Sequence, residues 1–323
     1  MELIAGDIGG THSRLAWVAG DGTTRPIRRF ARDYPSAAFA TADDLIRQFI
    51  GDAGAPAAPD ALLLAVPGPV ESQHVALTNL DWRIDAADMR ASLGIAQVRF
   101  INDFQAAAAG VAMLGADDVV ALNAQPVEAN GVRVVTGAGT GLGLAYLLPD
   151  EDGRLRTHAS EGGHADFAPA DARQARLLER LRARYGHVSW ERVASGMAMH
   201  DLYVFCCDET GAALPDSGPL DGAAVSSRAA AGDAVAMATL DLFVDLFAAW
   251  VGNVALMFQP RGGLYLAGGI AVHLQSRLQA PRFMAVATDK GRMRCVVERT
   301  PVFLVTNARL GIEGAIASGW TTH

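Results

Sequence analysis

Two segments of the chain repeat the same arrangement of a strand, a glycine-rich turn and a second strand. The first runs from residue 2 to 18 around the turn Gly9-Gly10-Thr11-His12, and the second runs from 132 to 148 around a turn at 137–141. Apolar and β-branched residues on both sides of such turns are typical of β-hairpins. The recurrence is a weak internal repeat, and it predicts a chain made of two related α/β halves.

The rest of the chain is expected to alternate strands and helices, as in other α/β proteins. Apolar runs predict buried strands at 61–66, 98–101 and 263–267. Periodicity and breakers predict helices at 104–114, 171–184 and 270–278, and an exposed loop at 211–222. The length of 323 residues suggests two domains at roughly 150 residues each. No Pro- or Ser-rich linker separates them, so we expect a shared interface.

The charged residues exclude several classes of function. Lys and Arg number 27 and Asp and Glu number 35, so the net charge of −8 leaves no basic surface for nucleic acid. Lys290 is the only lysine, and because Gly291 follows it the chain cannot contain a Walker-type phosphate loop. The early-strand lysine of protein kinases is excluded for the same reason.

The cysteines and apolar segments favour a cytoplasmic protein. Cys206 and Cys207 are adjacent and Cys295 is distant, which suits neither a disulfide framework nor a CxxC metal site. The N-terminus lacks the basic region of a signal peptide. The longest apolar stretch, 238–258, is interrupted by two aspartates, so it predicts a buried helix and not a membrane span.

The glycine-rich turns are candidate phosphate sites, because such turns leave backbone N–H groups uncovered. Two loops together would hold one nucleotide, whereas either loop alone is more often only a tight turn. Gly137-Ala138-Gly139 begins like a dinucleotide-binding fingerprint, but Leu142 stands where the third glycine is required. Asp7 precedes the first turn, where a carboxylate beside phosphates would carry Mg²⁺, directly or through water. A turn-capping role for Asp7 is equally compatible with the sequence.

Polar residues at two further places are candidates for a binding site. Asn102 and Asp103 follow a predicted strand and precede a helix, so Asp103 is either a general base or an N-cap, and the residues alone favour the cap. Glu161 and His164 flank two glycines that argue for a loop, where both side chains could bind sugar hydroxyls. The alternative is a structural histidine beside a surface glutamate. Glu191 has the pattern of a charge on a solvated helix face.

Taken together, these segments resemble the bacterial glucokinase family, within the superfamily of hexokinase, actin and chaperone ATPase domains. The matching motifs occur in order along the whole chain: Gly6-Asp7-Ile8-Gly9-Gly10-Thr11, Ile101-Asn102-Asp103-Phe104, Gly137 to Gly143, Glu161-Gly162-Gly163-His164, Glu191-Arg192-Val193 and Ala267-Gly268-Gly269-Ile270. Each motif is weak alone, but six in register are specific.

The resemblance implies a function for each of these motifs. It implies that glucose contacts Asn102, Asp103, Glu161, His164 and Glu191, with Asp103 as the base, which overturns the preference for a cap. It implies that MgATP is held by Asp7, Gly9, Gly10, Thr11, Gly137, Gly139, Thr140 and Gly141, with Gly268 and Gly269 near the adenosine. The first loop departs from the family pattern, since His12 and Ser13 stand where Asn-Ala is commoner, and this departure concerns loop contacts to phosphate. The zinc-containing repressor/kinase branch is excluded, because three scattered cysteines cannot form its zinc motif.

We therefore expect two ribonuclease H-like (actin-type) α/β domains flanking a cleft. The smaller comprises 1–108, completed by a C-terminal helix within 307–323, and the larger comprises 109–306. The expected reaction transfers the γ-phosphoryl group of ATP to the 6-hydroxyl of glucose. The alternatives are a kinase for another hexose or with ADP or polyphosphate as donor, and a chaperone- or actin-like ATPase. A homodimer is compatible with the sequence.

Overall fold

The computed structural model describes residues 1–21, 25–54, 58–77, 80–215 and 218–320. It is a mixed α/β protein, as the sequence predicted. The chain divides into two compact units. The first comprises Met1–Gly115, Thr157–Ala159 and Asn307–His323, and the second comprises Ala116–Arg156 and Ser160–Thr306.

The first unit is built on a five-stranded sheet with the order β3-β2-β1-β4-β7. The strands are β1 (Glu2–Ile8), β2 (His12–Ala19), β3 (Ile27–Pro35), β4 (Ala61–Val66) and β7 (Gln97–Asn102). β1, β2 and β3 are antiparallel neighbours, whereas β4 and β7 run parallel to β1. The predicted hairpin at 2–18 is therefore confirmed, and parallel strands extend the sheet beside it.

The second sheet has six strands in the order β11-β10-β9-β12-β13-β8, all from the second unit except Thr157–Ala159 in the middle of β11, which belong to the first. The strands are β8 (Val119–Ala121), β9 (Arg133–Ala138), β10 (Leu142–Pro149), β11 (Leu155–Ser160), β12 (Gly263–Ala267) and β13 (Val302–Val305). β9 and β10 form the second predicted hairpin, and β12 and β13 run parallel to β9. Apart from the edge strand β8, this sheet repeats the order of the first, so the predicted internal repeat is confirmed.

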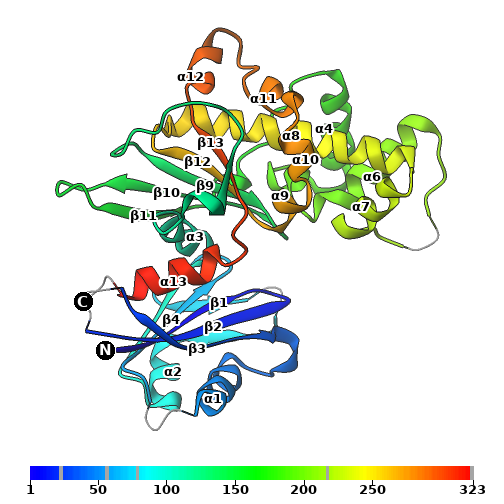
Figure 1. Ribbon diagram of the computed structural model, residues 1–323. Coiled ribbons are helices and arrows are strands. Elements are labelled where there is room, and N and C mark those ends of the chain that lie inside the picture. Colours follow the sequence, from blue (N-terminus) through cyan, green and yellow to red (C-terminus); the bar gives the residue numbers. More distant parts are fainter. Residues whose placement is uncertain (22–24, 55–57, 78–79, 216–217, 321–323) are drawn as a thin grey trace. The chain divides into compact units, whose positions relative to one another are not determined.

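Helices from both ends of the chain cover the first sheet. They are α1 (Ala42–Ala53), α2 (Ala86–Leu93), α3 (Asp103–Val111) and α13 (Leu310–Trp320), with short elements η1 (Ser36–Ala38), β5 (His74–Ala76) and β6 (Arg83–Asp85) between them. α13 is the last helix, yet it lies along the sheet of the N-terminal strands, where Ile312 and Ile316 join the core that contains Leu3 (Figure 1).

α13 also packs closely against α3, and glycines make this possible. A Cβ atom on Gly314 would collide with the carbonyl oxygen of Ala106, and one on Gly110 would collide with that of Leu310. The two helix backbones therefore meet where side chains are absent. The predicted C-terminal segment ends at 321–323, which lie outside the described residues.

The second unit is mainly helical around its sheet. Its helices are α4 (Ala172–Tyr185), α5 (Glu191–Ala194), α6 (Ala198–Thr210), α7 (Gly222–Ala230), α8 (Ala234–Phe258), α9 (Gly269–His273), α10 (Gln275–Leu278), α11 (Pro281–Ala287) and α12 (Arg294–Glu298), with the short helices η2 (Ala116–Asp118), η3 (Gly162–His164) and η4 (Gly291–Met293). α8 runs beside the second sheet (Figure 1), and Trp250 on it donates to Thr136 Oγ1 at 2.9 Å.

α8 is long and apolar enough to cross a membrane by length and composition, but most of its apolar stretch is buried inside the protein. This agrees with the buried helix predicted at 238–258. The strands predicted at 61–66 and 263–267 have those bounds, and the helix predicted at 104–114 begins one residue earlier and ends at Val111. The predicted loop at 211–222 has no regular structure up to Asp221, with 216–217 outside the described residues.

One helix that the sequence predicted as continuous is interrupted in the structure. Residues 270–278 form two short helices, α9 and α10, that are interrupted at Leu274. The ring of His273 lies 2.6 Å from the carbonyl oxygen of Gly269, where it competes for an acceptor of the helix. The break itself lies at Leu274, whose φ of −98° and ψ of 16° depart from the helical conformation.

Candidate active site

The candidate residues of the first unit lie at the carboxyl ends of parallel strands. Asp7 is near the end of β1, Asn102 ends β7, and Asp103 begins α3. The register aligns Asp7 with Ala65 on β4, and Ala65 with Ile101 on β7. Ligand-binding groups of open α/β sheets lie at this edge. The three polar residues therefore belong to one edge of the first sheet.

The structure separates the roles of Asn102 and Asp103. Asn102 is the N-cap of α3, and its Oδ1 accepts hydrogen bonds from the N–H groups of Phe104 at 2.9 Å and Gln105 at 3.1 Å. Its Nδ2 donates to the carbonyl oxygen of Gly68 at 3.1 Å. Asp103 is the first helical residue, and its Oδ1 also accepts from Phe104 N. The cap that the residues alone assigned to Asp103 is therefore made by Asn102, which keeps one amide hydrogen for a ligand.

Asp7 is a mostly buried carboxylate with a cationic neighbour. Arg14 Nη1 donates to Asp7 Oδ2 at 3.4 Å, and Arg14 Nε lies 3.8 Å from Asp33 Oδ2. Burial raises the pKa of Asp7, although Arg14 partly opposes this effect. The start of α13 lies against the same carboxylate, since a Cβ atom on Gly311 would be 2.7 Å from Asp7 Oδ2. A second cation beside Asp7 would favour its charged form.

The first glycine loop, which we define as Gly9 to Thr11, is closed by a single backbone bond. Gly9 N–H donates to the carbonyl oxygen of His12 at 3.0 Å. A Cβ atom on Gly9 would lie 2.8 Å from the same oxygen, so the turn requires glycine at this position. His12 is exposed on the strand that follows, whereas the side chain of Ser13 is fully buried.

The second glycine loop, which we define as Gly139 to Gly141, is held by a neighbouring turn. β9 extends through Ala138, so the loop is shorter than the predicted turn at 137–141. Gly139 N–H donates to the carbonyl oxygen of Gly141 at 2.9 Å. Two residues between α5 and α6 donate to the loop, Gly196 N–H to Gly139 O at 2.9 Å and Met197 N–H to Thr140 O at 3.3 Å. The carbonyl groups at 139 and 140 are thus engaged by the protein.

Packing explains some of the glycines of the second unit and leaves others unexplained. A Cβ atom on Gly137 would collide with the carbonyl oxygen of Ala267, and one on Gly268, where φ is +96°, would lie 2.6 Å from that of Ala138. These two glycines allow β9 and β12 to approach. A Cβ atom on Gly139 or Gly269 would meet nothing within 4 Å. The space beside these two glycines is open, as it is beside Gly153, Gly186 and other glycines of this unit.

Three ionisable side chains of the second unit gather beside this loop. His164 Nε2 lies 3.8 Å from Glu161 Oε2, and His164 Nδ1 lies 3.8 Å from Glu191 Oε1. The side chains of Glu161 and His164 are more than half exposed, whereas that of Glu191 is only 16% exposed. Glu191 is therefore not the solvated helix charge that its local sequence indicated.

Glu191 connects this cluster to the second glycine loop. Its Oε2 accepts a hydrogen bond from Leu142 N–H at 2.9 Å, directly after the loop. A Cβ atom on Gly141 would collide with Oε2, and one on Gly163 would collide with the carbonyl oxygen of Leu142. The glycines in both motifs thus allow the loop, the Glu161–His164 segment and Glu191 to converge on one residue.

The structure groups the predicted residues by unit. Asp7, Gly9, Gly10, Thr11, Asn102 and Asp103 belong to the first unit, and Gly137, Gly139, Thr140, Gly141, Glu161, His164, Glu191, Gly268 and Gly269 belong to the second. The sequence analysis did not single out Arg14. The signal that could have found this residue is its position opposite Asp7 in the predicted hairpin. Within the described ranges, no group of three or more His, Cys, Asp or Glu side chains is arranged to hold a metal ion.

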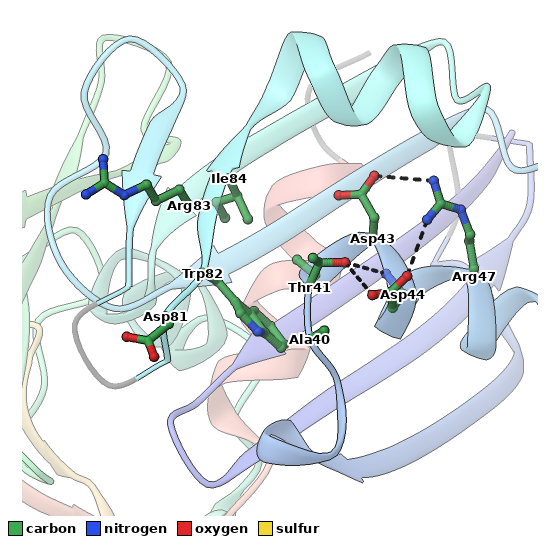
Figure 2. A pocket seen from close by; sticks show the side chains of 10 residues that line it. Ala40, Thr41, Asp43, Asp44, Arg47, Asp81, Trp82, Arg83 and Ile84 are labelled. Atoms are coloured by element: carbon green, nitrogen blue, oxygen red, sulfur yellow. Dashed lines mark hydrogen bonds and ion pairs between the residues drawn. The ribbon is translucent and has the colours of Figure 1, made fainter.

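A separate hollow of about 560 Å³ lies at the start of α1 and includes none of these residues. Figure 2 shows that Thr41 Oγ1 bonds both the N–H and the carboxylate of Asp44 at the start of the helix and that Arg47 lies between Asp43 and Asp44, whereas no interaction is drawn for Asp81 and Arg83. Because this hollow contains none of the predicted motif residues, we assign the candidate site to the strand ends and glycine loops instead.

The chain is similar to known proteins over nearly its whole length. The profile of the glucokinase family matches residues 4–320. A curated glucokinase from Synechocystis sp. is 38% identical, over 98% of this chain and 97% of its own length. The crystal structure of a glucokinase from an Antarctic psychrotroph has a TM-score of 0.83 at 32% identity, covering 98% of both chains. A ROK-family glucokinase from Streptomyces griseus, solved with glucose and AMPPNP, shares the fold with a TM-score of 0.65 at 21% identity and 98% coverage of both chains.

Proposed function

The chain belongs to the glucokinase family, and on that premise we propose which of its residues carry the reaction. The protein is an enzyme that uses ATP to phosphorylate glucose. The expected alternative of a chaperone- or actin-like ATPase is therefore set aside. The proposal concerns the acceptor hydroxyl, the catalytic base, the sugar contacts, the phosphate loops and the metal.

The position of Glu191 is the observation that carries the proposal. One carboxylate oxygen faces His164, and the other holds the backbone N–H that follows the second glycine loop. Carboxylate and imidazole groups that converge in this way can bind neighbouring sugar hydroxyls. We assign the recognition of glucose to Glu161, His164 and Glu191, together with the remaining amide hydrogen of Asn102.

Asp103 is the proposed general base. The structure supports this role because α3 has Asn102 as its cap, so Asp103 is not required in that position. In the reaction the 6-hydroxyl oxygen of glucose forms a bond to the γ-phosphorus of ATP, and the bond to the ADP oxygen breaks. The hydroxyl proton passes to the Asp103 carboxylate. Transfer of this type depends mainly on positioning and on charge stabilisation, with the base adding a smaller share.

The two glycine loops are proposed to hold the phosphates of ATP, with Gly268 and Gly269 near its adenosine. The open space at Gly139 and Gly269 supports close approach of a ligand to both. Asp7 fits a magnesium ion, because it is a buried carboxylate whose charged form needs a further cation, and Mg²⁺ takes one or two carboxylates plus water and phosphate oxygens. When bound, the ion would neutralise charge on the phosphates.

The shared strand order of the two sheets supports two ribonuclease H-like domains, which we place at 1–108 with 307–323 and at 109–306. We also propose a cytoplasmic location, consistent with free thiols at Cys206, Cys207 and Cys295.

A panel of donors and acceptors tests the proposed function. Release of ADP and formation of the 6-phosphate are measured with glucose, mannose, glucosamine and fructose, using ATP, ADP and polyphosphate as donors. We expect the highest kcat/KM with glucose and ATP. A higher value with another sugar, or with ADP or polyphosphate, would contradict the assignment.

A further inference from the structure

The first glycine loop and the residue that follows it, His12, have three carbonyl oxygens that accept hydrogen bonds from within the first unit. Gly9 O accepts from Ser36 Oγ at 2.6 Å, and Thr11 O accepts from Ser36 N–H at 3.0 Å. His12 O accepts from Gly9 N–H at 3.0 Å. A single residue, Ser36, therefore binds the loop on both sides of Gly10.

Ser36 reaches the loop because of the strand register. β3 pairs with β2 so that Pro35 lies opposite His12 and Tyr34 lies opposite Ser13. Ser36 is the next residue, at the start of η1, and it follows β3 directly beneath the turn. This contact spans 27 residues of sequence between Gly9 and Ser36.

The hydroxyl of Ser36 is oriented by a second buried serine. Ser13 Oγ and Ser36 Oγ are 2.9 Å apart, and both residues have no exposed surface. A hydroxyl has only one proton to donate. Since Ser36 donates its proton to Gly9 O, the proton between the two serines must come from Ser13. The order of donation is Ser13 to Ser36 to Gly9.

These bonds control which groups of the loop a phosphate meets. Carbonyl oxygens repel phosphate oxygens, whereas backbone N–H groups attract them. We propose that Ser36 is a positioning residue for the nucleotide: it holds the carbonyl groups of Gly9 and Thr11 away from the phosphates, and Ser13 fixes its orientation. The proposal rests on the assignment of this loop to ATP. It also gives Ser13 a role beneath the loop, at a position where the family more often has alanine.

Three variants test the proposal: Ser36→Ala, Ser13→Ala and the double variant. Ser36→Ala keeps the backbone bond to Thr11 but removes the bond to Gly9. We expect its Kd for MgAMPPNP, measured by calorimetry, and its KM for ATP to rise roughly three- to tenfold, because a typical hydrogen bond is lost. The KM for glucose should stay within about twofold. Ser13→Ala should have a smaller effect in the same direction, and the double variant should match Ser36→Ala.

Thr239→Val is the matched control. Thr239 is a fully buried hydroxyl of α8 that donates to the carbonyl oxygen of Val235 at 2.8 Å, so the variant also loses a buried hydrogen bond. It should lower the melting temperature without changing either KM. If Ser36→Ala behaves like Thr239→Val, Ser36 is only structural and the proposal is wrong. Equal increases in both KM values would also overturn it.

Two further outcomes are decisive. If Ser36→Ala does not fold, Ser13→Ala decides, since it leaves Ser36 in place, and an unchanged Kd for MgAMPPNP would then contradict the proposal. If the parent protein phosphorylates glucose with ATP but the serine variants bind MgAMPPNP normally, the positioning role fails while the proposed function stands.

Discussion

The two units support their glycine loops with different chemistry. In the first unit, the hydroxyl and the N–H of Ser36 and the N–H of Gly9 hold the loop, and Ser13 bonds to Ser36. In the second unit, the carboxylate of Glu191 holds the residue after the loop and also faces His164. Loop support and the candidate chemistry are thus separate in the first unit and combined in the second.

This difference has a consequence for mutagenesis. In the first unit, a substitution at Asp103 should change catalysis, whereas one at Ser36 should change nucleotide binding. A substitution at Glu191 should change sugar and nucleotide binding together, because its side chain belongs to the proposed sugar-binding cluster and also holds the residue after the second glycine loop. The following predictions are ordered by the size of the expected effect.

The largest effect is expected for Asp103→Asn. The change removes a proton acceptor but keeps the volume and leaves the Asn102 cap intact, so kcat should fall by roughly 10²–10⁴ with both KM values nearly unchanged. Steady-state kinetics measure this. Asp88→Asn, the same change in the first turn of α2, is the control and should retain the parental kcat. A kcat for Asp103→Asn within about tenfold of the parent would show that Asp103 is not the base.

Glu191→Ala should weaken the binding of both glucose and the nucleotide, whereas Glu161→Ala should weaken the binding of glucose alone. Loss of hydrogen bonds to buried groups costs about 1–3 kcal/mol, so we expect the KM for glucose to rise roughly tenfold or more in both variants. Only Glu191→Ala should also raise the Kd for MgAMPPNP in the absence of glucose, because Leu142 N–H loses its acceptor. Unchanged nucleotide binding by Glu191→Ala would remove the contrast between the units.

Two alanine substitutions within the second loop should differ from each other. A Cβ atom at Gly141 collides with Glu191, so Gly141→Ala should lower both the melting temperature and the affinity for MgAMPPNP. A Cβ atom at Gly139 meets open space, so Gly139→Ala should leave the melting temperature unchanged and lower only the affinity for MgAMPPNP. Thermal unfolding and calorimetry give both quantities. Normal nucleotide binding by Gly139→Ala would show that no phosphate lies close to this position.

The smallest expected effect is that of Asp7→Asn on the melting temperature of the ligand-free protein. Burial raises the pKa of Asp7, so the folded state holds its proton more tightly than the unfolded chain. The contribution of Asp7 to stability is therefore greatest at acid pH and is lost as the pH rises through the raised pKa. The variant should melt roughly 2–4 °C higher than the parent near neutral pH, with a smaller gain at acid pH. A lower melting temperature at neutral pH would contradict this account.

The sequence predicted the parts of the fold that depend on neighbouring residues. The strand at 61–66 is a continuous apolar run, and the two hairpins have glycine at their turns, so local composition is sufficient. It did not predict which of two adjacent capping residues would cap α3, because this depends on the extended backbone of Asn102, with φ −65° and ψ 145°.

Long-range contacts could not be inferred from local patterns. Ser36 reaches Gly9 only through the pairing of β2 with β3, and Arg14 meets Asp7 only across the β1–β2 hairpin. Glu191 acquires its role through a contact with Leu142, 49 residues earlier. The family resemblance selected Glu191 where its local pattern indicated a solvated charge, and its low exposure agrees with that selection.

The close packing of α13 against α3 sets the order in which a newly synthesised chain can mature. Residues 1–115 leave the ribosome early, but the helix that covers their sheet and lies against Asp7 leaves it after the whole of the second unit. The second unit, which ends at Thr306, is by then already synthesised and can fold as a unit during translation. The element that carries Asp103, the proposed base, therefore acquires its packing partner only after the second unit has been synthesised, so a chain truncated before α13 lacks the helix that packs against α3.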